Sequence, residues 1–125
     1  MSKKVPTSTH LSEWPELDQH LWQVATQKGN FLERDGKAAH WSAATRLQVQ
    51  KGYGKWIFHL TAEGGLTAKD QETPIERVDE DQLRSYLECL KAQGLASQTI
   101  ASRIIDLTEA IRVMQPEANI TILRQ

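Results

Sequence analysis

The sequence predicts an all-α domain, a compact bundle of four main helices, and three observations point to it. Apolar residues recur at spacings of three and four along most of the chain, which is the period of an amphipathic helix. Residues that cap helices precede these stretches, and glycine or proline follows them. No stretch alternates between apolar and polar residues as a half-buried strand does. With 125 residues, 39% of them hydrophobic, the chain has enough apolar side chains for the core of one domain.

The first helix is expected to follow a flexible tail formed by residues 1–11, which are polar and aperiodic. Ser12 is the predicted cap, and Pro15 falls in the first turn, where a missing N–H costs no hydrogen bond. Residues 31–40 are expected to connect this helix to the next. The predicted apolar face contains Leu17, Leu21, Trp22, Val24 and Ala25.

The second helix is predicted to start at the cap Ser42 and to end at Gly64 and Gly65. Its apolar stripe is Val49, Tyr53, Trp56, Ile57 and Leu60, and the opposite, exposed side is Ala44, Leu47, Gln48, Lys51, Lys55 and His59. Gly52 and Gly54 lie within this helix, where each costs roughly 1 kcal/mol relative to alanine. We therefore expect another backbone, or DNA, to approach the helix closely at these glycines.

The third helix is predicted from Asp79, which caps it in a capping box with Gln82, to Gly94. Its buried face is Leu83, Tyr86, Leu87 and Leu90. Ser97 is the predicted cap of the fourth helix, which Pro116 ends. That helix buries Ile100, Ile104, Leu107, Ile111 and Met114 and exposes Gln98, Ser102 and Asp106, with Thr99 and Arg103 on the flank.

Charge is distributed unevenly along the chain, although 15 Lys and Arg nearly balance 16 Asp and Glu. Residues 36–62 and 89–105 contain no Asp or Glu, and half of the 16 acidic residues lie between them. A surface that faces phosphate must exclude carboxylates, because like charges in contact cost several kcal/mol. The acid-free windows are thus candidate phosphate-facing surfaces, and a chance distribution in a short chain is the alternative.

Several classes of site and location are not expected. A single cysteine, Cys89, excludes an intramolecular disulfide and a cysteine-rich zinc site, and the four histidines lack metal-ligand spacing. We expect no cofactor and no metal. No run approaches the roughly 20 apolar residues that span a bilayer, and no signal peptide is evident, so we expect a cytoplasmic protein without membrane contact.

Two segments resemble a known family, the phage-integrase-type tyrosine recombinases. Thr45–Leu60, which starts at a Thr and ends in an aromatic–aliphatic pair and a Leu, resembles the second helix of their N-terminal core-binding domain, which is SAM-like. The run 94–100, Gly-Leu-Ala-Ser-Gln-Thr-Ile, resembles the start of its fourth helix. The resemblance covers about residues 15–115, in the family's order and at its separations. Further matching positions are Pro74, Val78, Asp79, Glu80, Tyr86, Leu87, Leu90, Ile104 and Leu107.

The resemblance implies a domain, here residues 12–116, that clamps duplex DNA by placing helices two and four in the major groove. It also implies partners, namely duplex DNA and other recombinase protomers in a synaptic assembly, although we expect the isolated domain to be monomeric. The family's tyrosine nucleophile and its Arg, Lys and His partners belong to a following domain. In this chain Tyr53 and Tyr86 fall on apolar helix faces, so we expect no enzymatic activity. Residues 117–125 would then be a tail or a linker, and the chain a fragment or a stand-alone protein.

The candidate DNA-contacting residues are the polar and basic side chains on the free sides of helices two and four. Lysine neutralises phosphate and glutamine matches adenine edges, while hydroxyls in first turns add donors. Arg46 departs from the family, which has an apolar residue there. The full set is Ser42, Thr45, Arg46, Gln48, Lys51, Lys55, Ser97, Gln98, Thr99, Ser102 and Arg103. The alternative is that these are solvated faces of a helical protein-interaction adaptor with no DNA contact.

Overall fold

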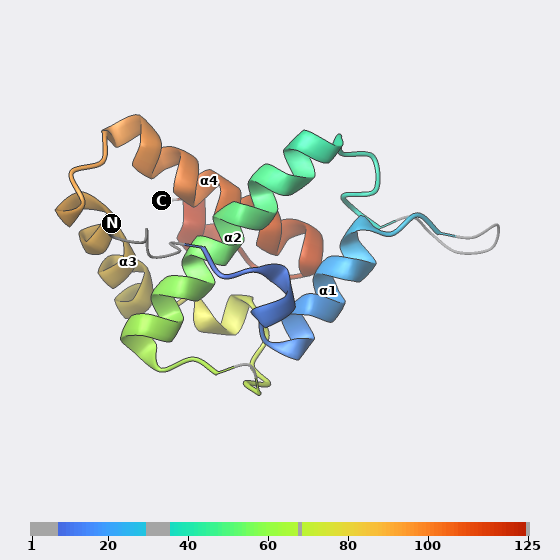
Figure 1. The fold of residues 1–125 in the computed structure, drawn as a ribbon, viewed down its shortest axis with the longest axis horizontal. Coiled ribbons are helices and arrows are strands. Elements are labelled where there is room, and N and C mark those ends of the chain that lie inside the picture. The colour runs from blue at the N-terminus through green and yellow to red at the C-terminus, as the bar shows by residue number, and fades with distance from the viewer. Residues whose placement is uncertain (1–7, 30–35, 68, 125) are drawn as a thin grey trace, which may run out of the picture.

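The computed structural model describes residues 8–29, 36–67 and 69–124 (Figure 1). Across these residues every regular element is a helix, so the prediction of an all-α bundle is confirmed. The expected tail before residue 8 and residues 31–35 of the expected connection lie outside the described residues. The α-helices are α1 Glu16–Thr26, α2 Ala43–Gly64, α3 Glu80–Ala92 and α4 Ser97–Met114. The short 3-10 helices are η1 Leu11–Glu13, η2 Ile75–Arg77 and η3 Thr121–Arg124.

Local capping signals define the ends of α2 and α3 as predicted. The Ser42 hydroxyl oxygen accepts a hydrogen bond from the Thr45 backbone N–H at 3.1 Å. The Asp79 carboxylate accepts one from the Gln82 backbone N–H at 2.7 Å. Gly65 ends α2 in the left-handed conformation at φ 71°, which glycine adopts without steric cost.

Two predicted caps are wrong. Ser12 lies inside η1, and the N-cap of α1 is Pro15, because the Trp14 N–H bonds to the Leu11 carbonyl and closes a separate 3-10 turn first. Ser97 is the first residue of α4, whose N-cap is Ala96 in an extended conformation without a side-chain hydrogen bond. Serine is a common N-cap residue, but the N-cap of α1 is three residues after Ser12, which takes part in η1, and the N-cap of α4 is one residue before Ser97.

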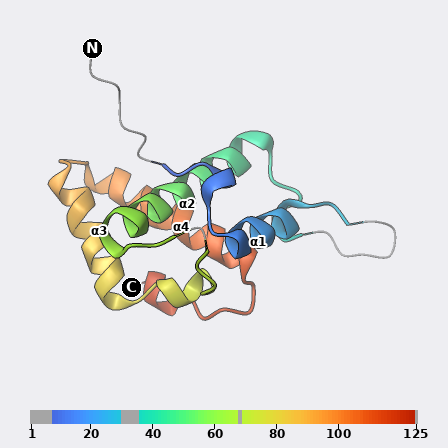
Figure 2. The same cartoon turned by 60° about the horizontal axis from the view of Figure 1, so that its bottom comes forward.

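The long helices α2 and α4 cross at the centre of the bundle, with α1 and α3 on opposite sides of the crossing (Figure 1). Figure 2 shows the C-terminal segment folding back beneath the bundle, where Ile122 of η3 lines a groove with α3 and Leu123 enters the core. The largest fully buried side chains include Trp14, Trp22 and Trp56. Burial of these aromatic side chains contributes much of the hydrophobic stabilisation.

Gly52 and Gly54, in the middle of α2, both mark close approaches, and at Gly54 the neighbour is another backbone, as expected. A Cβ added at Gly52 would meet the side chain of Asp106 on α4. A Cβ added at Gly54 would stand 2.5 Å from the carbonyl oxygen of Thr9, because residues 8–11 lie against α2. The Thr9 N–H donates to the Gly54 carbonyl at 3.0 Å. Part of the segment expected as a loose tail therefore covers one side of α2.

A buried ion pair joins α1 to η2, and the sequence analysis did not anticipate it. Asp18 is fully buried and accepts hydrogen bonds from Arg77 Nη1 at 2.9 Å and 2.7 Å. The Tyr53 hydroxyl on α2 also donates to Asp18, at 2.5 Å. Burial, followed by the Asp18 charge, raises the pKa of Tyr53 well above its usual value, so the phenol stays protonated. The network joins α1, α2 and η2 through a buried carboxylate that is paired with Arg77.

Candidate nucleic-acid interface

The first turns of α2 and α4 carry no acidic residue, whereas those of α1 and α3 each carry two. In Figure 1 the first turns of α2 and α4 lie at the upper edge of the molecule, on opposite sides of the point where the two helices cross. The free N–H groups and the dipole of a helix start attract anions. The absence of carboxylates in these first turns leaves that attraction unopposed there.

None of the predicted DNA-contacting residues is buried. Most are exposed, and the remaining three, Lys55, Thr99 and Arg103, are half-buried. On α2 the Ser42 hydroxyl is already engaged, since it accepts from the Thr45 N–H and donates to the Thr45 hydroxyl at 3.0 Å. These hydroxyls therefore form a closed pair at the helix start. Arg46 and Lys51 are exposed and have no ion pair among the described residues.

Gln48 of α2, one of the predicted DNA-contacting residues, forms a hydrogen bond to α4 where the two helices cross. Its side-chain amide donates to the Asp106 carboxylate at 3.3 Å, although the residue as a whole is exposed. Gln48 thus links the two helices through a hydrogen bond, although it also has solvent-exposed surface. Burial raises the pKa of Asp106, while the Gln48 hydrogen bond and the charge of Arg103 oppose that shift.

Two residues assigned to exposed faces are buried, which corrects the sequence analysis. Asp106 is 9% exposed because Gly52 lets α4 pack directly on this side of α2. His59 is 5% exposed and lies with Tyr86 of α3, with ring centroids 5.2 Å apart. The side of α2 that was predicted to be exposed is therefore exposed only in the N-terminal half of the helix. In the C-terminal half, at His59, the same side is buried against α3.

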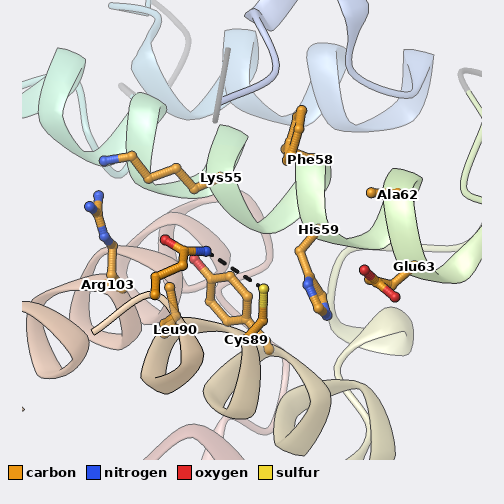
Figure 3. Close-up of a pocket in the computed structure, with 10 residues that line it drawn as sticks. Lys55, Phe58, His59, Ala62, Glu63, Cys89, Leu90 and Arg103 are labelled. Atoms are coloured by element: carbon orange, nitrogen blue, oxygen red, sulfur yellow. Dashed lines mark hydrogen bonds between the residues drawn. The ribbon is translucent and has the colours of Figure 1, made fainter. Parts of the chain in front are cut away.

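Lys55 and Arg103 bring the two predicted surfaces together. They line one pocket between α2, α3 and α4, and Figure 3 shows their charged ends on the same side of it, with Glu63 across from them. Lys51 lies on the other flank of α2, where its carbonyl accepts a hydrogen bond from the Ser8 hydroxyl at 2.9 Å. A groove lined by Leu47, Lys51, Lys55 and residues 8–11 runs there.

Within the residues that the structure describes, no three His, Cys, Asp or Glu side chains are grouped to hold a metal ion. No helix in that part of the chain has the length and apolar character required to cross a bilayer. Cys89 is half-buried, and Gln93 approaches its sulfur at 3.6 Å.

Comparison of the chain with protein-family models, with curated proteins and with solved structures finds no match in any of the three.

Sequence reasoning missed the pocket residues His59, Tyr86 and Cys89 as a group, because they come from two helices and each belongs to an apolar or mixed helix face. A signal for Asp18 was present. This carboxylate falls four residues after Trp14 and four before Trp22, and both tryptophans are buried. A charged residue on such a stripe indicates a buried partner, although the spacing does not say which one.

Proposed function

We propose that this chain is a DNA-binding module that holds duplex DNA with the N-terminal parts of α2 and α4. The observation that carries the proposal is the pairing of two acid-free first turns with exposed or half-buried basic side chains on the same two crossing helices. The sequence resemblance supports the further inference that the module belongs to a tyrosine-type site-specific recombinase and that duplex DNA and other protomers are its partners. By that resemblance the module positions DNA and breaks no bond.

Each group has a definite part in this proposal. Lys51, Lys55 and Arg103 neutralise phosphates, and their contacts are independent of sequence. Gln98 and Ser102, both exposed on α4, are the groups available to base edges. The hydrogen bond between Gln48 and Asp106 holds the two arms at a fixed angle, which reduces the ordering cost of binding.

The test is a titration of a fluorescently labelled duplex with the protein, followed by anisotropy at low salt. We expect binding to every duplex, with affinity that falls steeply between about 50 and 200 mM salt, because each phosphate contact contributes a log–log slope of about −0.9. An adaptor that binds only protein would give no anisotropy change at low salt, and that result would reject the proposal.

A further inference from the structure

A cavity of about 140 Å³ opens between the C-terminal half of α2, α3 and the start of α4. Its lining includes Phe58, His59, Tyr86 and Leu90, with Lys55 and Arg103 at one side (Figure 3). Roughly 150 Å³ is enough to hold a benzene ring in a protein interior. The cavity therefore has the size for one ring or a branched aliphatic group.

Three buried polar atoms of the lining residues have no hydrogen-bond partner among the described residues. They are His59 Nε2, Tyr86 Oη and Arg103 Nε. His59 and Tyr86 are more than nine-tenths buried, at 5% and 3% exposure. Buried polar groups in proteins nearly always have a partner, because leaving one unpaired costs free energy. His59, Tyr86 and Arg103 all line this cavity, so we look to a ligand bound there for the missing partners.

The charges around the cavity define the kind of ligand. Lys55 and Arg103 form no ion pair within the described part of the chain, and Figure 3 shows their charged ends close to one another. The Arg Nε–H, the Lys ammonium and the Tyr hydroxyl are donors. Glu63 is exposed and lies at the opposite side (Figure 3). An anionic acceptor group therefore fits at the Lys55 and Arg103 side, with an apolar body against Phe58 and Leu90.

We propose that this cavity is a binding site for a small organic carboxylate with an apolar body about the size of one ring. The carboxylate accepts hydrogen bonds from Arg103 Nε and Tyr86 Oη and pairs with Lys55, and the ring packs between α2 and α3. The proposal is independent of DNA binding, although Lys55 and Arg103 belong to both sites.

Benzoate is the probe, and its uncharged analogue benzyl alcohol is the control ligand. In a calorimetric or NMR titration of the full chain without DNA, we expect saturable benzoate binding of about millimolar affinity and much weaker binding of benzyl alcohol. Tyr86→Phe should lower benzoate affinity about tenfold, because a hydrogen bond to a charged group is lost. Its melting temperature should equal or exceed that of the wild type, since the hydroxyl has no protein partner.

The other tyrosine of the chain gives the matched variant. Tyr53→Phe removes a hydroxyl that is bonded to Asp18, so it should lower the melting temperature and leave benzoate affinity unchanged. No saturable benzoate binding, equal binding of benzyl alcohol, or an unaltered affinity in Tyr86→Phe would overturn the proposal. The first of these results would indicate that the cavity holds only water. Because the titration contains no DNA, its failure would leave the DNA-binding proposal standing, and the converse also holds.

Discussion

Gly52 of α2 packs directly against Asp106 of α4, and a Cβ added at Gly52 would clash with the Cβ of Asp106. The contact lies on the same flank of α2 as the hydrogen bond between Gln48 and Asp106, one helical turn away. The glycine therefore sets how closely the two proposed DNA-binding helices approach. The low helix propensity of glycine lowers the stability of α2 at this position, but a larger residue would push the two helices apart.

Gly52→Ala should lower the free energy of unfolding by about 1–3 kcal/mol, despite the better helix propensity of alanine, because the two helices must move apart. Gly64→Ala in the last turn of the same helix is the control. An added Cβ there would meet only the flexible end of Gln82 at 3.4 Å, so this change should be neutral or stabilising. Urea unfolding compares the two variants, and a stabilised Gly52→Ala would contradict the close approach.

Loss of the buried ion pair should lower the free energy of unfolding more than Gly52→Ala does. Asp18→Ala should destabilise the protein by about 3–5 kcal/mol, because Arg77 would remain buried with only the more distant carboxylate of Asp70, at 3.8 Å, to balance its charge. Arg84→Ala breaks an exposed pair with Glu80 and should cost less than about 1 kcal/mol. Thermal or urea unfolding measures both changes. Equal losses would mean that the Asp18 network does not hold α1 and η2 in place.

Stability should also depend on pH through His59. Burial lowers the pKa of His59 below its usual 6.5, with Glu63 opposing the shift. Below about pH 6.5 the unfolded chain binds a proton that the folded chain resists, so stability should fall as the pH falls toward the folded-state pKa. The raised pKa of Asp106 acts in the opposite direction, since the folded state then holds a proton more tightly than the unfolded state.

His59→Gln should therefore flatten the fall in stability between about pH 6.5 and 5. His20→Gln changes an exposed histidine of α1 and is the control. Urea midpoints measured across this pH range test the assignment. A fall that persists unchanged in His59→Gln would place the proton uptake elsewhere.

Helix ends were predictable from sequence where one residue determines them. The apolar stripe of α2 was also predicted correctly, but its exposed side was predicted only in part. Ser42, Asp79 and Gly65 act through hydrogen bonds or dihedral angles within a few residues. A helical wheel divides a helix into one buried and one exposed side. The helix α2 contacts α4, α3 and residues 8–11 around its circumference, so His59 became interior.

The ion pair between Asp18 and Arg77 could not be predicted from the sequence for a related reason. Asp18 and Arg77 are 59 residues apart, and no local pattern joins them. The exposure of most candidate side chains was easier to predict, because an exposed position depends only on its own helix and a free side. Asp106 was misplaced because Gly52 removes the side chain that would otherwise have kept α4 away from that flank.

Sequence preference should depend on Gln98, which is exposed in the first turn of α4. Gln98→Ala should change the ranking of affinities among duplexes more than their mean, since a base-edge contact contributes about 1–3 kcal/mol of discrimination. Gln23→Ala, an exposed glutamine of α1, is the matched control. Competition titrations with a panel of duplexes measure the ranking. A ranking that is identical in both variants would remove Gln98 from the interface.

The most direct test of the DNA-binding proposal is the salt dependence of duplex binding by a lysine pair on α2. Lys51→Ala with Lys55→Ala should weaken binding to every duplex and make the log–log salt slope shallower by about two. The control pair, Lys69→Ala with Lys91→Ala, removes the same charge from exposed positions outside α2 and α4. Anisotropy titrations at several salt concentrations compare the two double variants with the wild type. The proposal predicts a shallower slope for the α2 pair alone, and equal slopes for all three proteins would contradict it.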